Sequence, residues 1–355
     1  MTTSFALSDA LRSEVDQRLR AFVDRQRPLV SGPELSPLLT AAEDFLAGGK
    51  RLRPAFCYWG WRGAGGDDDP AIYTAAASLE LLQASALIHD DVMDASDLRR
   101  GKPSAHRRFQ AMHEEAGWRG SAAQFGEGAA VLLGSLLLVW SGEMWRTSGL
   151  PADALAAAEP VHDLMRTELM CGQYLDLLEQ AHGDSTFDSA LRVALHKSGK
   201  YSVEQPLRLG LLLADRGQAP WIDGLCVDYG QKVGIAFQLR DDVLGVFGDP
   251  AETGKPAGDD LREGKRTMLI ARALSAASPE QAADVRLLLG DPKLEEDGVE
   301  RLRGIIEETG ALAASEEMIK RYLDDALMSL ERSPITGEAR DALAELAVAA
   351  TSRRS

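Results

Sequence analysis

Two clusters of aspartates are spaced to hold metal ions. The first is Asp90-Asp91-Val92-Met93-Asp94, at the end of an apolar stretch with helical periodicity. Asp90 and Asp94 are four residues apart and therefore share one face of a helix. Because the negative end of the helix dipole disfavours carboxylates there, we expect this pair to bind cations. Carboxylate oxygens suit Mg²⁺, which often bridges to phosphate. The alternative is a solvated acidic helix end.

The second cluster runs from Gln238 to Gly245 within another apolar helix, and Gln238 shares a face with Asp241. Unpaired buried carboxylates are costly, so Asp241 and Asp242 require partners. Those partners are either Mg²⁺ ions shared with the first cluster or a structural salt bridge to Arg240 or a neighbour.

Two short basic segments could bind anions. The first is Gly48-Gly49-Lys50-Arg51-Leu52-Arg53-Pro54, where backbone N–H groups at the start of the following helix also favour an anion. The second is Arg99-Arg100-Gly101-Lys102-Pro103, whose guanidinium groups suit bidentate phosphate recognition. The alternatives are a basic turn in the first case and salt bridges to Asp94 or Asp97 in the second.

A third segment, residues 253–267, carries Lys255 and Lys265 on either side of several acids. Such a segment could be a lid that brings lysines to phosphate, or an ordinary solvated loop. His196, Lys197 and Ser198 lie in a helical stretch and are unremarkable by themselves.

The elements that must position these residues are all helical by periodicity. No segment alternates as a strand would, so we predict one all-α domain over residues 1–355, with long helices around a central cavity. Its motif-bearing core is expected over about 36–280 and a C-terminal helical layer over about 281–350. The expected helices are residues 8–27, 36–48, 54–63, 70–95, 105–116, 121–146, 151–180, 188–215, 220–247, 266–277, 279–289, 296–308, 312–332 and 337–350.

Composition narrows the class of protein. The 355 residues are 45% hydrophobic and 26% charged, as in folded soluble proteins. A net charge of −16 argues against a general nucleic-acid surface. Three scattered cysteines exclude a disulfide framework and fit the cytoplasm. We expect no signal peptide and no transmembrane segment, because the longest apolar stretch, Ala129 to Trp140, is too short to span a bilayer.

In their order along about residues 45–270, these motifs resemble those of the trans-isoprenyl diphosphate synthases. The resemblance implies an all-α fold, usually a homodimer, and about three Mg²⁺ ions per active site. It also implies condensation of isopentenyl diphosphate with an allylic diphosphate. By the resemblance Asp90, Asp94 and Asp241 match metal ligands, while Lys197 and Lys255 match catalytic residues on the allylic side.

The resemblance also assigns substrate contacts. Lys50, Arg53 and Arg100 match residues that hold the diphosphate of isopentenyl diphosphate, and Arg99 matches one that holds the allylic diphosphate. Gln238 matches a further allylic-side residue, and Lys265 a lysine of the closing loop.

The sequence departs from the family pattern at three positions. Gln83 stands where a histidine is common among the contacts to isopentenyl diphosphate, and Ser198 replaces a common threonine. Gly245 stands where many members carry the last aspartate of the second motif, and Asp249 is a candidate to compensate.

Product length is expected to depend on the residues one turn before Asp90. Ser85 and Ala86 are small where farnesyl-producing relatives often carry an aromatic floor, which favours a product of twenty carbons or more. Leu82 or Trp140 could supply a lower floor, or the small residues could simply permit close helix packing. The competing functions are a class I terpene cyclase, a non-catalytic subunit of a heteromeric synthase and an acidic helical scaffold.

Overall fold

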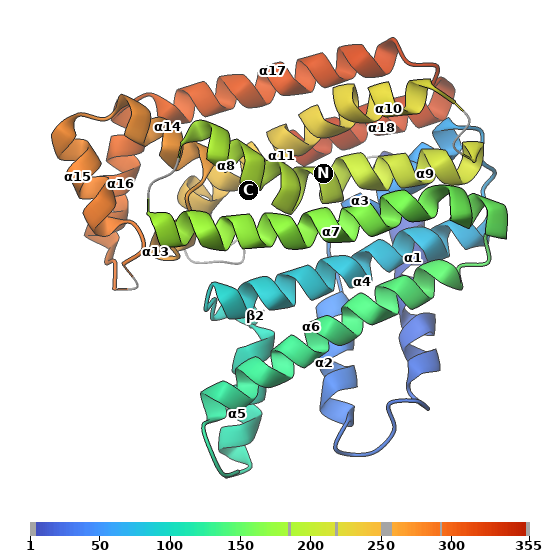
Figure 1. The fold of residues 1–355 in the computed structure, drawn as a ribbon, viewed down its shortest axis with the longest axis horizontal. Helices are drawn as coiled ribbons and strands as arrows, with labels where there is room; N and C mark the ends of the chain where they lie inside the picture. The colour runs from blue at the N-terminus through green and yellow to red at the C-terminus, as the bar shows by residue number, and fades with distance from the viewer. Residues whose placement is uncertain (1–4, 184–185, 217–218, 250–257, 292, 353–355) are drawn as a thin grey trace. The chain divides into compact units, whose positions relative to one another are not determined.

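The computed structural model describes residues 5–183, 186–216, 219–249, 258–291 and 293–352. Within these residues nearly every element is a helix, and strands occur only as one short hairpin (Figure 1). The all-α prediction is therefore confirmed. Packing divides the chain into two compact units, which are described separately below.

Each unit is assembled from three separate stretches of chain. The first consists of Met1–Asp163, Pro206–Asp223 and Pro334–Leu346, and the second of Leu164–Gln205, Gly224–Ser333 and Ala347–Ser355. The expected C-terminal layer over about 281–350 is thus shared between the units. The prediction of a single domain stays a prediction.

The long helices α4 and α6 form the centre of the first unit (Figure 1). Pro70 starts α4, and the Asp69 carboxylate accepts a hydrogen bond from the Ala71 N–H at 2.7 Å. Helices α1 and α3 pack on α4, and α5 packs on α6. The elements are η1 Phe5–Leu7, α1 Asp9–Gln26, α2 Ser36–Leu46, α3 Leu52–Gly63, α4 Pro70–Met93, α5 Ala105–Glu115, α6 Ala122–Arg146 and α9 Gln205–Asp215.

Small residues let α4 and α6 approach closely. A Cβ on Gly134 would lie 2.5 Å from His89 Nε2, so only glycine fits there without displacing the imidazole. Two turns further along α6, the Ser141 hydroxyl donates a hydrogen bond to the backbone oxygen of Ser78 on α4 at 2.8 Å. The C-terminal end of α4, which carries the first aspartate cluster, is therefore held firmly by its neighbour.

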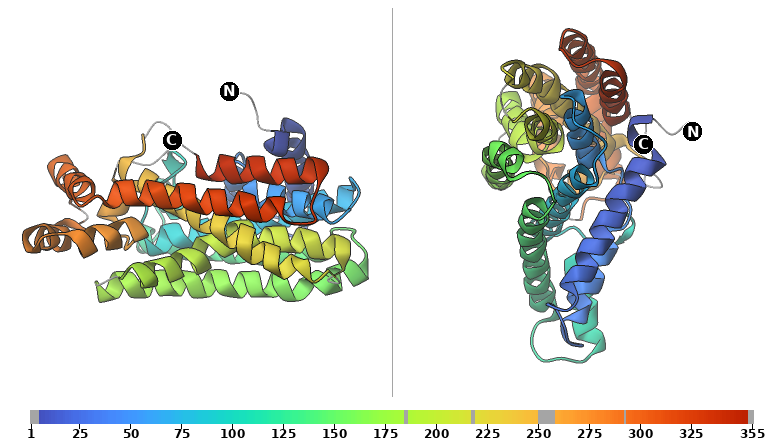
Figure 2. Two further views of the ribbon diagram at one scale, coloured as in Figure 1. Left: turned by 90° about the horizontal axis from the view of Figure 1, so that it is seen from above. Right: turned by 90° about the vertical axis from the view of Figure 1, so that its right-hand side faces the viewer.

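Helix α11 lies at the centre of the second unit, with η2, η3, α17 and α14 packed around it (Figure 2). Its apolar side joins a core with α13 and α16 that includes Val243, Leu261 and Val299. The elements are α8 Phe187–Ala194, η2 Leu195–Glu204, η3 Cys226–Gln231, α11 Lys232–Phe247, α13 Asp259–Arg262, α14 Met268–Ala276, α15 Pro279–Leu288, α16 Glu296–Glu308 and α17 Ala311–Glu331. Besides α9, whose first residue Gln205 belongs to the second unit, three helices of the described chain have residues in both units: α7 Ala152–His182, α10 Trp221–Leu225 and α18 Gly337–Thr351.

The stretch expected as one helix over 188–215 contains a π-helix, η2. Hydrophobic periodicity does not reveal such a widened turn, because the apolar residues remain on one side. Close glycine contacts surround it: a Cβ on Gly172 would lie 2.3 Å from Lys197 N, and one on Gly234 would lie 2.6 Å from Gly199 O. Wide helical turns of this kind occur frequently at functional sites.

Two helices are long and apolar enough to cross a bilayer by length and composition, α4 and α6. In α4, 67% of the most apolar window is buried, as expected for the core helix of a folded protein. In α6 only 28% of that window is buried. Much of the apolar surface of α6 is therefore exposed.

Candidate active site

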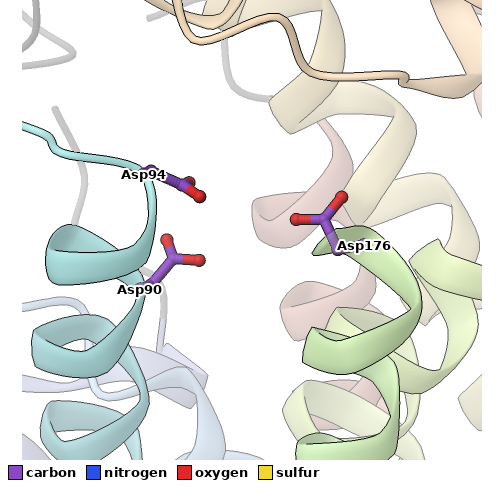
Figure 3. Close-up of side chains that lie close together, drawn as sticks. All are labelled: Asp90, Asp94 and Asp176. Carbon is purple, nitrogen blue, oxygen red and sulfur yellow. The ribbon is translucent and has the colours of Figure 1, made fainter. Parts of the chain in front are cut away.

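The first aspartate cluster closes helix α4. Asp90 lies in its last turn and Asp94 is its C-terminal cap (Figure 3). A carboxylate oxygen of each lies within 4.8 Å of one from the other. Asp91, between them, is fully buried. Two oxygens at this separation on one helix face fit a hard divalent cation.

Arg99 binds this cluster. Its Nε donates to Asp91 Oδ1 at 2.9 Å, and its Nη2 lies 3.6 Å from Asp90 Oδ2. Asp97, one of the salt-bridge partners considered from the sequence, accepts from Arg107 Nε at 2.6 Å. Arg99 therefore lies beside the Asp90–Asp94 pair.

The segment Arg99–Lys102 folds as a tight hairpin between β1 Leu98–Arg99 and β2 Lys102–Pro103, paired antiparallel. The sequence analysis expected no strand here. Its turn residues Arg100 and Gly101 have φ of 54° and 72°, as a two-residue hairpin turn with positive φ requires. The turn directs Arg100 toward the other basic segment: Nη1 lies 3.4 Å from the backbone oxygen of Phe45.

The two basic segments meet in the first unit. A Cβ on Gly49 would lie 3.5 Å from Arg100 Nη2 and 3.7 Å from Arg51 Nη1. Partial desolvation lowers the pKa of Arg100; the Glu80 charge opposes this, and the charges of Arg51, Arg99 and Arg53 lower it further. Four guanidinium groups gathered in this way favour a multiply charged anion.

Arg51 connects this basic cluster to the acids Asp16 and Glu80. It is buried, adopts a left-handed conformation with φ 55°, and donates to Asp16 Oδ1 at 2.9 Å through Nε and to Glu80 Oε2 at 2.5 Å through Nη1. Burial alone lowers the pKa of Arg51, but the charges and hydrogen bonds of Glu80 and Asp16 outweigh it and raise the pKa.

The other candidate contacts of this region lie nearby in the chain. Lys50 directly precedes Arg51 and is exposed, and Arg53 lies in the first turn of α3. Gln83 lies partly buried on α4.

In the second unit, Lys197 and Ser198 lie in η2. Lys197 Nζ lies 2.5 Å from Oδ2 of Asp176. Figure 3 shows Asp176 on helix α7. A second lysine of the same π-helix, Lys200, pairs with Glu168, which also accepts from Gln205 Nε2 at 2.9 Å. Two lysine–carboxylate pairs thus join η2 to α7.

The second aspartate motif lies on α11. Asp242 is buried and accepts from Gln238 Nε2 at 2.7 Å and from the backbone N–H of Met268. Burial raises its pKa to about 8; the Gln238 hydrogen bond opposes this, and the charges of Asp260 and Asp241 add to it. Asp242 therefore joins α11 to the start of α14.

Arg240 does not have the role considered for it from the sequence, whereas the role of Asp249 stays a prediction. Arg240 does not neutralise the aspartate pair: its guanidinium binds Glu316 with two contacts of 2.6 Å and the backbone oxygen of Thr351. Asp249 is exposed, beyond the end of α11. Lys265 lies 3.4 Å from Asp260 Oδ1 and 2.6 Å from Glu263. Lys255 lies outside the described residues.

Sequence reasoning missed Arg51, Asp176, Glu168 and Asp260. The spacing Gln173-x-x-Asp176 on an amphipathic helix was the available signal for Asp176. Arg51 was noted only as part of a basic run, because burial and a left-handed backbone do not follow from residue type.

Comparisons with known proteins agree with this arrangement. The polyprenyl synthetase family model matches residues 36–306. The chain is 34% identical over 292 residues to geranylfarnesyl diphosphate synthase of Aeropyrum pernix, covering 81% of this chain and 85% of that one. It is 30% identical over 306 residues to octaprenyl diphosphate synthase of Escherichia coli, covering 85% and 86%.

Solved structures agree as well. The chain superposes on geranylgeranyl pyrophosphate synthase of Corynebacterium glutamicum, solved with isoprenyl diphosphate and magnesium. The TM-score is 0.93 at 39% identity, and the match covers 98% of this chain and 99% of that one. The resemblance inferred from the motifs is confirmed.

Proposed function

This chain belongs to the polyprenyl synthetase family and is a trans-prenyltransferase, and from that premise we propose that it joins isopentenyl diphosphate head to tail to an allylic diphosphate, with geranylgeranyl diphosphate as product. The observation that carries the proposal is the gathering, within one unit, of Arg51, Arg53 and Arg99 around Arg100, with Arg99 also 3.6 Å from Asp90. A terpene cyclase does not need this second diphosphate site. A non-catalytic subunit would not need to retain Asp90 and Asp94.

We assign the metal ligands to Asp90, Asp94 and Asp241, and we propose Mg²⁺, about three ions per site. The partly buried carboxylates of Asp90 and Asp94 at the C-terminal end of α4 fit this ion. When bound, Mg²⁺ offsets the charge that develops on the leaving diphosphate. The protein's contribution is to fix the carboxylates before the reaction begins.

The cationic residues divide between two diphosphates. Lys50, Arg53 and Arg100 would hold isopentenyl diphosphate, with Gln83 as an uncharged contact. For the allylic diphosphate we assign the contacts that the family pattern gives: Arg99, Lys197, Ser198, Gln238, Lys255 and Lys265. Cleavage of the allylic C–O bond leaves its electron pair on the diphosphate. The isopentenyl double bond then forms the new C–C bond, and a proton passes to the released diphosphate.

The small residue Ser85, in the buried part of α4, supports a product of twenty carbons. Ser85 is fully buried, and its hydroxyl has no hydrogen-bond partner among the described residues. A small side chain there leaves room that an aromatic residue would fill. The names of three relatives specify products of twenty, twenty-five and forty carbons, which supports a product of at least twenty carbons.

The exposed face of α6 supports a homodimer. Phe125, Leu132 and Val139 are seven residues apart and exposed, and Leu132 and Val139 are each 66% exposed. The small residues Gly128 and Ser135 alternate with them and are also exposed. This heptad spacing suits a second copy of α6, because small residues at alternate positions permit close approach. We propose that the dimer forms in the cytoplasm, in keeping with the free cysteines.

The test is a product assay. Purified protein would be incubated with Mg²⁺, labelled isopentenyl diphosphate and, separately, the five-, ten- and fifteen-carbon allylic primers, and the products dephosphorylated and sized. A twenty-carbon alcohol is expected. A fifteen-carbon end product would retain the reaction and overturn the product length, whereas hydrocarbons without elongation would indicate a cyclase.

A further inference from the structure

The second aspartate motif lacks a carboxylate at Gly245, but another residue fills the place of its side chain. A Cβ built on Gly245 would lie 1.8 Å from Asp260 Oδ2. The carboxylate of Asp260 therefore lies directly against the Cα of Gly245, in the position that a side chain at 245 would require.

Helix geometry places this carboxylate beside Asp241. Residues 241 and 245 are one turn apart on α11 and share a face. Asp90 and Asp94 have the same spacing on α4, and their oxygens lie within 4.8 Å of one another. The carboxylate of Asp260 therefore lies against the residue one helical turn after Asp241, the sequence spacing that separates Asp90 from Asp94.

The segment that carries Asp260 is held in place by packing. Leu261, the next residue, is fully buried in the core that contains Val243 and Val246 of α11. Gly258, at the start of α13, has φ of 71°, and a Cβ there would lie 2.7 Å from Val299 Cγ1. The core of this unit therefore fixes the backbone that brings Asp260 to Gly245.

The two oxygens of Asp260 have different surroundings. Oδ1 lies 3.4 Å from Lys265 Nζ, while Oδ2 faces Gly245. Asp242, the third acid of the group, is buried and accepts hydrogen bonds from Gln238 and Met268. Of the acids around Gly245, Asp241 and Asp260 are both only partly buried, as a metal ligand must be to meet its ion.

We propose that Asp260 supplies the second metal site with the carboxylate that Gly245 lacks, so that Asp241 and Asp260 together bind the ion on α11. This inference rests on the proposed function, because the ion is the Mg²⁺ assigned there. It replaces Asp249, the sequence candidate, with a residue from a different element. It also explains why glycine is required at 245: any side chain would displace the ligand.

The experiment measures metal binding directly. Mn²⁺ would be titrated into the full-length protein with inorganic diphosphate present, and free Mn²⁺ followed by electron paramagnetic resonance. Asp260→Asn and Gly245→Ala are both expected to weaken the Mn²⁺ site on α11 by roughly 10- to 100-fold. The added methyl of Gly245→Ala meets only the side chain of Asp260, at 1.8 Å from Oδ2 and 2.5 Å from Cγ, so that carboxylate must turn away from α11 while the fold is kept. Asp249→Asn is the matched control and should bind Mn²⁺ as the wild type does.

A swap of the two positions makes the test decisive. Gly245→Asp combined with Asp260→Ala returns a carboxylate to the same place from α11 itself, and should restore Mn²⁺ binding that Asp260→Ala alone has lost. A purely structural role for Asp260 would not be rescued in this way. Wild-type affinity in Asp260→Asn, or loss of binding in Asp249→Asn, would overturn the inference. Failure of the wild type to bind Mn²⁺ and to elongate any primer would instead reject the proposed function.

Discussion

Arg51 Nη1 lies 2.5 Å from Glu80 Oε2, and both side chains are buried. The pair joins the turn before α3 to the middle of α4. Asp16 on α1 completes the group, at 2.6 Å from Arg51 Nη2. The residue between the anion-binding candidates Lys50 and Arg53 is therefore fixed to two other helices, although its own backbone is left-handed.

Replacing Arg51 should destabilise the fold. We expect Arg51→Met to lower the free energy of unfolding by about 3–5 kcal/mol, because Glu80 would remain as a buried charge without its partner. Arg27→Met is the control, since Arg27 pairs with Asp24 and Glu43 on the exposed surface, where such pairs contribute about 0–1 kcal/mol. Urea unfolding would compare them, and equal losses in both variants would contradict the interpretation.

Asp90 and Asp94 should be required for turnover. We expect Asp90→Asn and Asp94→Asn each to lower kcat by roughly 10²–10³-fold, the magnitude typical of losing one electrostatic contact to a transition state. Chelation with EDTA should abolish elongation, and added Mg²⁺ should restore it. Asp97→Asn, which loses only the exposed contact with Arg107, is the matched control. Full activity in the presence of EDTA would contradict the assignment of the ligands.

Ser85 should influence the chain length of the product only through the small volume of its side chain. We expect Ser85→Phe to shift the product from twenty carbons to fifteen, because an aromatic ring would occupy buried space on α4. Ser85→Ala removes the hydroxyl without adding volume and should leave the product unchanged. Chromatography of the dephosphorylated alcohols distinguishes the two results. An unchanged product in Ser85→Phe would assign the floor to Leu82 or Trp140 instead.

The stripe on α6 should hold the dimer. We expect Leu132→Glu to yield a monomer, since a charge on a buried apolar seam is left without a partner. Leu287→Glu on α15 is the control, because Leu287 is 77% exposed and lies outside the stripe. Sedimentation equilibrium would report the mass of each variant. A wild-type chain that is monomeric at micromolar concentration would contradict the proposal.

Much of this protein could be predicted from residue order. Hydrophobic periodicity located the helices because each long helix keeps one apolar side, and caps such as Asp69-Pro70 marked their starts. The spacing of Asp90 and Asp94 predicted a shared helix face, since that relation is local. The widened helix over Leu195–Glu204 escaped detection because its hydrophobic side is unchanged.

Residue order predicts relations within one element: the helical class, the two aspartate motifs and the basic segments that identify the family. Which side chains meet across elements depends on the tertiary structure. It bound Arg99 to Asp91, buried Arg51 against Glu80, and placed Asp260 where Gly245 has no side chain. These contacts join residues that are far apart in sequence or on different elements. Their distances depend on how helices and loops pack, and sequence spacing predicts distances only within one helix or turn.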